Sequence, residues 1–182
     1  MMYKSHSNRG KHLEKLIEFY GHRYQNKQIA YLIKYPPVIK HLRTLKNGQF
    51  VATYAAKGQP DYLMISEGNS FLFDAKEFKG NRFPFSNLHA HQFKALNEFE
   101  KCGGYSALLL HAIDINQLFV APFISFKSLY MDWMESRISH KPTKRGSASI
   151  SLEYMSNEFI QWDDDGFLTG FRMMVAERDL PW

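Results

Sequence analysis

Cysteine is nearly absent from this sequence of 182 residues, which contains a single one, Cys102. An internal disulfide and a zinc site made of several cysteines are therefore excluded, and we expect Cys102 to be a small buried apolar group in an intracellular, cytoplasmic protein. No run of about 18 apolar residues occurs, and the first residues hold no apolar stretch of signal-peptide length, so we expect neither membrane spanning nor secretion. Internal repeats and low-complexity tracts are absent as well.

The chain is rich in apolar and aromatic residues. Hydrophobic residues make up 45% of it and aromatic residues 15%. These shares are sufficient for a hydrophobic core, and the length fits one compact domain over residues 1–182. Lysine and arginine exceed aspartate and glutamate by 23 to 18, which gives a net charge of +5 and indicates a polyanionic partner, although proteins that bind no polyanion also reach this charge.

The helices and strands that the sequence predicts alternate along the chain, which indicates an α/β sandwich. Apolar residues at helical spacing predict a first helix from Gly10 to near Gly21. Residues 29–42 read as a kinked or edge strand because two prolines interrupt them, and Asn47-Gly48 predicts a protruding hairpin ribbon. Further predictions are a helix from Ser86 or Asn87 to Gly103, strands over 105–113 and 117–123, a helix over 125–138, and then a basic loop with short strand-like segments.

Residues 59–78, QPDYLMISEGNSFLFDAKEF, alternate like two strands of a hairpin, yet they carry charges at its open end. With Gly68-Asn69 as the turn, Asp61 faces Lys76 and Leu63 faces Asp74. Because strand side chains alternate with period two, Asp61, Asp74 and Lys76 emerge on one face, at the rim of an otherwise apolar surface.

Two carboxylates at such a rim repel each other unless a positive charge lies between them. A hard divalent cation with oxygen ligands meets this need, and magnesium is the natural candidate. Magnesium bound to phosphate supports phosphodiester hydrolysis, with Lys76 neutralising developing charge or orienting the nucleophile. The alternative is a structural salt bridge in which Lys76 pairs across the strands with Asp61.

Two further residues are candidates for the same site. Gln92 falls on the inward face of the predicted helix that starts near Ser86, where it is either a satisfied core amide or a group delivered to the charged rim. Glu14 borders the apolar stripe of the first helix, where it is either a third carboxylate or a solvated flanking residue.

Pro60-Asp61 followed across a turn by Asp74-x-Lys76 resembles the core of the PD-(D/E)xK nucleases. A more specific resemblance, between Asn8 and Trp133, is to the RecU-type Holliday-junction resolvases. It is carried by four segments in this order: NRGKHLE, KYPPVI, FDAKEFKGNRFPFSNLHAHQ and LFVAPF. The family has a restriction-endonuclease-like fold, a mixed β-sheet flanked by helices with a protruding stalk. It acts as a homodimer that cuts four-way DNA junctions by paired nicks.

The resemblance implies a catalytic set of Glu14, Asp61, Asp74, Lys76 and Gln92, with Mg²⁺, or Mn²⁺ in its place, held by Asp61, Asp74 and Glu14. Residues 38–57 take the place of the stalk that engages the junction centre. Asp74 stands where the family usually has glutamate, and we expect activity to survive because both residues serve in the broader motif. The stalk segment is a few residues short, which leaves strict four-way selectivity open. Recombinase proteins are a further expected partner. Expected DNA contacts are Arg9, Lys11, Arg43, Lys46, Lys57, Lys79, Arg82 and His89.

Other interpretations remain for several of these residues. Lys79 and Arg82 fit a solvated loop as well as a phosphate contact, and His89 and His91, about 200° apart on a regular helix, are predicted not to share a metal. The alternatives to a junction resolvase are a nuclease of the same superfamily that cuts flaps or duplex DNA, and a DNA-binding recombination accessory protein without turnover.

Overall fold

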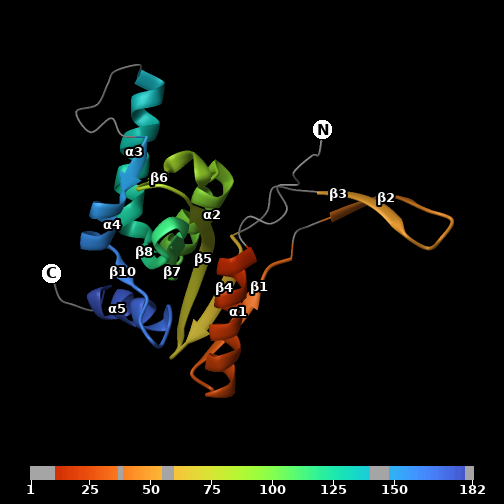
Figure 1. The fold of residues 1–182 in the computed structure, drawn as a ribbon, viewed down its shortest axis with the longest axis horizontal. Coiled ribbons are helices and arrows are strands. Elements are labelled where there is room, and N and C mark those ends of the chain that lie inside the picture. The colour runs from red at the N-terminus through yellow and green to blue at the C-terminus, as the bar shows by residue number, and fades with distance from the viewer. Residues whose placement is uncertain (1–10, 37–38, 55–59, 140–147, 179–182) are drawn as a thin grey trace.

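The computed structural model describes residues 11–36, 39–54, 60–139 and 148–178. Its mixed central sheet with helices on both faces (Figure 1) confirms the predicted α/β class and agrees with the restriction-endonuclease-like fold. Within the described ranges, no helix has both the length and the apolar character needed to cross a membrane. The elements are α1 (Lys11–Asn26), β1 (Ala30–Lys34), β2 (Ile39–Thr44), β3 (Phe50–Tyr54), β4 (Tyr62–Ser66), β5 (Asn69–Phe78), β6 (Arg82–Pro84), η2 (Phe85–Asn87), α2 (Ala90–Lys101), β7 (Tyr105–Ala112), η3 (Ile113–Ile115), β8 (Gln117–Pro122), α3 (Phe123–Ser139), β9 (Ser149–Ser151), α4 (Leu152–Glu158), β10 (Ile160–Gln161) and α5 (Leu168–Arg178).

The central sheet has the strand order β1-β4-β5-β7-β8-β10. β5 and β7 run parallel, and the other neighbouring pairs are antiparallel. The chain between β5 and β7 passes through β6, η2 and α2, which is the long crossover that parallel neighbours require. β1 lies at the edge of the sheet, where the following prolines 36 and 37 predict it to be.

Each face of the sheet carries its own hydrophobic core. One core joins Leu13 and Ile17 of α1 and Phe171 of α5 to Tyr62 and Phe73 of the sheet. The other joins residues of α2, α3, α4 and β6 to the opposite face, with Leu72, Leu96, Leu108, Phe123 and Phe126 among its members. Strands β5 and β7 are thus buried on both sides, and polar side chains in them must find partners inside the protein.

The turn of the β4–β5 hairpin consists of Glu67 and Gly68, so the predicted turn at Gly68-Asn69 is wrong by one residue. Both turn residues have positive φ, as a type I′ turn requires. The side chain of Glu67 also contacts α5, where Arg172 donates a hydrogen bond from Nε to Glu67 Oε1 at 3.1 Å. Tyr62 consequently pairs with Phe73, and the register shifts by two residues. A shift of two leaves every side chain on its predicted face, because strand side chains alternate with period two.

β2 and β3 form a separate two-stranded ribbon that projects away from the central sheet (Figure 1). Its turn contains Asn47 and Gly48, as predicted, and Gly48 has the positive φ that the turn needs. A bulge interrupts the pairing between His41 and Arg43. Of the predicted stalk segment 38–57, residues 39–54 are described.

The first helix does not end at Gly21, as its sequence predicts, but continues to Asn26. A Cβ atom at Gly21 would lie 2.3 Å from Leu32 Cδ2, so this glycine permits close packing of α1 on β1 instead of terminating the helix. The prediction of short strand-like segments after residue 148 is wrong in part, because α4 and α5 are helices. Cys102, expected to be buried, is exposed at the end of α2.

Candidate active site

The structure brings Asp61, Asp74 and Lys76 together at the open end of the β4–β5 hairpin, as predicted. Asp61 immediately precedes β4, and its Oδ2 accepts a hydrogen bond from the Ala75 backbone N–H at 3.0 Å. Asp74 and Lys76 lie on the same face of β5, and Lys76 Nζ is 2.6 Å from Asp74 Oδ2. The ion pair therefore joins Lys76 to Asp74 along one strand, and not to Asp61 across the strands as in the alternative structural salt bridge.

Asp74 is fully buried, which is rare for a carboxylate because ionisation in an apolar interior is costly. The pKa of Asp74 rises to about 7, because burial raises it more than the Lys76 ammonium lowers it, and the neighbouring Asp61 carboxylate adds to the rise. Asp74 Oδ2 faces the Lys76 ammonium at 2.6 Å, so a positive charge already lies beside this buried oxygen.

The other oxygen of Asp74 is held by Gln92. Gln92 is 7% exposed on α2, and its Nε2 donates to Asp74 Oδ1 at 2.7 Å. Its Oε1 accepts from the His89 backbone N–H at 3.2 Å, as part of a capping box at the start of α2. Gln92 is therefore both inward-facing, as its helical position predicts, and oriented toward the charged rim.

The capping box also corrects the predicted start of this helix. His89 is the N-cap residue, while Ser86 and Asn87, the predicted caps, belong to η2. Because His89 is not helical, the predicted separation of about 200° from His91 does not apply, and the two rings stack with their centroids 5.6 Å apart.

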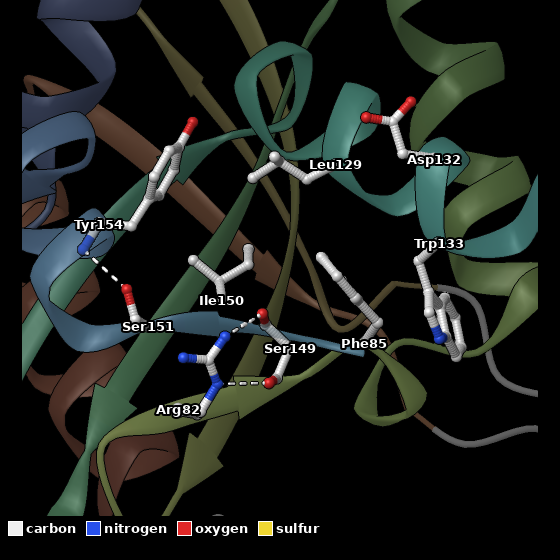
Figure 2. A pocket seen from close by; sticks show the side chains of 9 residues that line it. All are labelled: Arg82, Phe85, Leu129, Asp132, Trp133, Ser149, Ile150, Ser151 and Tyr154. Atoms are coloured by element: carbon white, nitrogen blue, oxygen red, sulfur yellow. Dashed lines mark hydrogen bonds between the residues drawn. The ribbon is translucent and has the colours of Figure 1, made fainter. Parts of the chain in front are cut away.

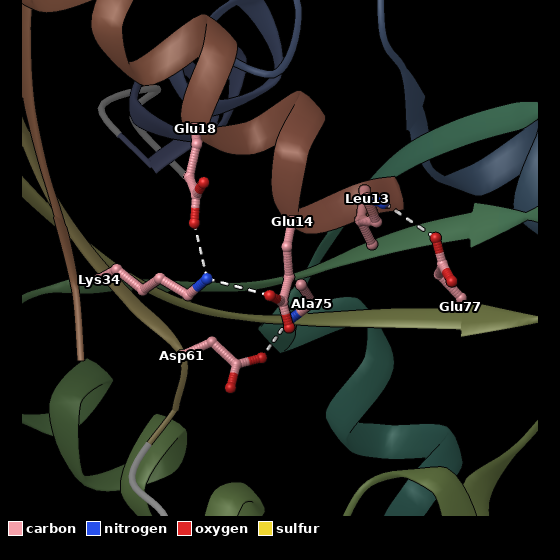
Figure 3. Close-up of polar contacts among 7 residues, drawn as sticks. All are labelled: Leu13, Glu14, Glu18, Lys34, Asp61, Ala75 and Glu77. Atoms are coloured by element: carbon pink, nitrogen blue, oxygen red, sulfur yellow. Dashed lines mark hydrogen bonds and ion pairs between the residues drawn. The ribbon is translucent and has the colours of Figure 1, made fainter. Parts of the chain in front are cut away.

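Glu14 lies on α1 at the edge of this region (Figure 3). Its Oε2 is 3.0 Å from Lys34 Nζ on β1, and Glu18 Oε1 is 2.6 Å from the same ammonium. Burial raises the pKa of the Tyr62 hydroxyl, and Glu14, Glu18 and Asp61 all contribute to the rise while Lys34 opposes it. Glu14 and Asp61 therefore act on the same buried tyrosine from two elements. Sequence reasoning missed Lys34, since no spacing or motif links it to Glu14.

The donor set fits a magnesium-type cation with few protein ligands. Asp61 and Asp74 supply carboxylate oxygens, and the buried Oδ2 of Asp74 is paired with the Lys76 ammonium. In the part of the chain that the structure describes, no three histidine, cysteine, aspartate or glutamate side chains are grouped closely enough to hold a metal by themselves. Magnesium tolerates this, because it keeps several waters and takes one or two carboxylates together with substrate phosphates.

The expected DNA contacts do not gather at one place. Arg43 and Lys46 are exposed on the β2–β3 ribbon, Lys11 is exposed at the start of α1, and Lys79 is exposed in the loop after β5. Arg9 and Lys57 lie outside the described residues.

Arg82 borders a cavity of about 150 Å³ between α3, α4 and the β6–β9 pair (Figure 2). Its guanidinium donates from Nε to Ser149 Oγ at 2.7 Å and from a terminal nitrogen to the Ser149 carbonyl at 2.9 Å. The cavity is lined by none of the residues around Asp74. Arg82 therefore has an internal structural contact in addition to any role at the surface.

Comparison with known proteins identifies relatives over most of the chain. The model of the RecU family, recombination protein U, matches residues 8–167. A Holliday junction resolvase RecU of Staphylococcus saprophyticus is 28% identical over 128 residues, which cover 67% of this chain and 62% of the relative. Proteins of the same name from Streptococcus gordonii and Streptococcus mutans are 26% and 27% identical over 155 and 167 residues, covering 82% and 88% of this chain and 72% and 79% of theirs.

Proposed function

The chain belongs to the RecU family, and from this premise we propose that it is a structure-selective DNA endonuclease that resolves Holliday junctions by paired nicks in recombination and repair. The observation that carries the proposal is the state of Asp74. This carboxylate is fully buried, is held by Gln92 on one oxygen, and faces the Lys76 ammonium at 2.6 Å on the other. A buried carboxylate in this condition lowers the stability of the fold, as groups that serve chemistry often do.

We propose that Asp61 and Asp74 hold Mg²⁺, with Glu14 as a third contributor and Mn²⁺ as a substitute. The ion supplies charge for a phosphate oxygen and activates water when it is bound. Gln92 keeps Asp74 Oδ1 occupied, so that Oδ2 remains directed toward Lys76. The Lys76 side chain is 18% exposed, and its ammonium can neutralise negative charge that develops on the scissile phosphate or orient the nucleophile.

The remaining proposals concern the substrate and the assembly. The exposed cations of the β2–β3 ribbon, Arg43 and Lys46, suit contacts with the phosphate backbone of a branched DNA, since such contacts position a protein without reading bases. Paired nicks in two strands are made most simply by two active sites, and the described residues of one chain form one candidate site, so we propose a homodimer. A cytoplasmic location and contact with recombinase proteins follow from the same role.

The proposal is tested by incubating the protein with labelled four-way junction, flap and linear duplex DNA in Mg²⁺ or EDTA. Wild-type protein is expected to place symmetric nicks in the junction with Mg²⁺ only, and Asp74→Asn is expected to lose at least about 100-fold in rate, as removal of a group that acts on charge in the transition state does. The matched control is Asp132→Asn, an exposed aspartate on α3, which should cut normally.

Each other outcome contradicts part of the proposal. Equal cutting of flaps or duplex would identify a nuclease of the same superfamily with another substrate. Junction binding without cutting in Mg²⁺ or Mn²⁺ would overturn the enzyme and leave a DNA-binding accessory protein.

A further inference from the structure

A second polar group is buried on the opposite face of the catalytic strand. Glu77, next to Lys76 on β5, pairs in register with His111 of β7, and their side chains are 9% and 3% exposed. The His111 Nδ1–H donates to Glu77 Oε1 at 3.3 Å, since a carboxylate can only accept, and His111 Nε2 lies 3.1 Å from Asn116 Oδ1. His111 is thereby held between two polar side chains.

Glu77 also reaches the start of α1. Its Oε1 accepts a hydrogen bond from the Leu13 backbone N–H at 2.9 Å (Figure 3). The backbone N–H groups in the first turn of a helix have no partner within the helix, and a negative charge is stabilised there by the helix dipole. The carboxylate therefore joins the first turn of α1 to β5, at the residue before Glu14.

The contact between Glu77 and Leu13 restricts the rotation and axial position of α1, which the hydrophobic core specifies only loosely. Leu13 and Ile17 bury α1 against the sheet, but apolar burial is not directional and specifies the rotation and axial position of a helix only loosely. A buried polar pair adds little net stability, since apolar residues of similar volume are often equally stable or better there. Its effect is instead geometric, because one hydrogen bond of defined length fixes where the first turn lies.

We propose that Glu77 is a positioning residue that anchors the first turn of α1 and so holds Glu14 in place relative to Asp61 and Asp74, with His111 fixing the Glu77 side chain. The inference rests on the proposed function, in which Glu14 belongs to the active site. Lys76 and Glu77 are adjacent in β5 and point to opposite faces, so a single strand carries the chemistry on one side and the anchor on the other.

The test compares Glu77→Met, which keeps the volume without an acceptor, with Glu77→Gln, which keeps an oxygen for the Leu13 N–H and the His111 donor. Glu158→Gln, an exposed glutamate on α4, is the matched control. We expect Glu77→Met to bind junction DNA like wild type but to cut it about 10- to 100-fold more slowly under saturating single-turnover conditions, because a small misplacement of a catalytic group can cost this much. Glu77→Gln should recover most of the rate, and the thermal midpoint should change little in any variant.

A readout that does not depend on cleavage is hydrogen exchange of the Leu13 amide followed by NMR. Protection should fall at least about tenfold in Glu77→Met, as a tenfold change in local opening corresponds to loss of one hydrogen bond, and should persist in Glu77→Gln. Wild-type cleavage by Glu77→Met would overturn the inference, as would parallel losses of stability, DNA binding and rate without rescue by Glu77→Gln. If wild type cuts no DNA, the proposed function fails, and unchanged Leu13 protection in Glu77→Met would then also overturn the anchor.

Discussion

Gln92 Nε2 donates a hydrogen bond to Asp74 Oδ1 at 2.7 Å and so joins α2 to β5 inside the protein. The same side chain caps its own helix through the His89 backbone N–H. One amide therefore uses its donor for the Asp74 carboxylate and its acceptor for the start of the helix. The orientation of Asp74 is tied in this way to where α2 begins.

Replacement of Gln92 should affect both structure and activity. Gln92→Met keeps the volume but removes the donor to Asp74 and the acceptor for His89, and we expect a loss of about 1–3 kcal/mol in the free energy of unfolding. Cleavage of a four-way junction should fall by about 10- to 100-fold, because Asp74 is no longer oriented. Urea unfolding and single-turnover cleavage measure the two effects. Gln161→Met, at an exposed position on β10, is the control, and wild-type activity in Gln92→Met would show that the amide is only a core group.

The raised pKa of Asp74 predicts how stability depends on pH in the absence of metal. Because the pKa rises from 3.8 to about 7 on folding, the native state binds a proton more tightly than the unfolded chain between these values. The contribution of Asp74 to stability is therefore complete below about pH 4 and is lost as pH rises through about 7. Asp74→Asn removes this dependence. The free energy of unfolding of the variant, relative to that of wild type, should therefore increase between pH 5 and pH 8 by at most about 3 kcal/mol.

Urea unfolding in EDTA at several pH values measures this difference, with Asp132→Asn as the control. A difference between Asp74→Asn and wild type that does not change with pH would mean that Asp74 titrates near its ordinary pKa. Added Mg²⁺ should stabilise wild type more at pH 8 than at pH 5, because protons compete with the cation for the carboxylate.

How far the sequence predicts this site depends on which contacts are local. The period-two pattern of residues 59–78 places Asp61 and Asp74 on one face even though it predicts the turn one residue too late, since both registers share the same alternation. The inward position of Gln92 follows from helical spacing alone. By contrast, the contacts of Glu14 with Lys34 and of Leu13 with Glu77 join elements whose docking no local pattern specifies.

The same reasoning explains the errors in the fold. Gly21 ends a helix in the sequence pattern, but in the structure it lies where Leu32 packs on the helix, and only the tertiary contact distinguishes the two roles. α5 contains Thr169 and Gly170, which are poor helix formers. Gly170 packs closely against Val120, because a Cβ atom at position 170 would lie 2.6 Å from Val120 Cγ2. Packing therefore overrides propensity in this segment.

Removal of Lys34 should test whether Glu14 contributes to cation binding. Lys34 is bound by Glu14 and Glu18, and although burial lowers its pKa, these two hydrogen bonds raise it above the ordinary value. In Lys34→Met the Glu14 carboxylate loses a competing positive charge, so half-maximal cleavage should require about two- to tenfold less Mg²⁺. Stability should change by less than about 1 kcal/mol, because all three side chains are more than 40% exposed.

A Mg²⁺ titration of the cleavage rate provides this measurement. Lys94→Met is the matched control, since Lys94 pairs with Glu98 on α2, where both side chains are well exposed. An unchanged Mg²⁺ requirement in Lys34→Met would exclude Glu14 from the metal site.

The charges of the β2–β3 ribbon should contribute to DNA binding without contributing to the chemical step. Arg43 and Lys46 are exposed on this ribbon, and Figure 1 shows that it stands apart from the sheet that carries Asp74. If each cation contacts one phosphate, Arg43→Gln and Lys46→Gln should each lower the slope of log affinity against log salt by about 1, because fewer counterions are released. The slope is obtained by measuring junction affinity at several salt concentrations between about 50 and 200 mM.

Lys94→Gln serves as a control for loss of one positive charge elsewhere, and an equal change in that variant would mean that net charge, and not the ribbon, determines the salt dependence. The cleavage rate at saturating protein should be unchanged in both ribbon variants, since neither residue lies among the groups around Asp74.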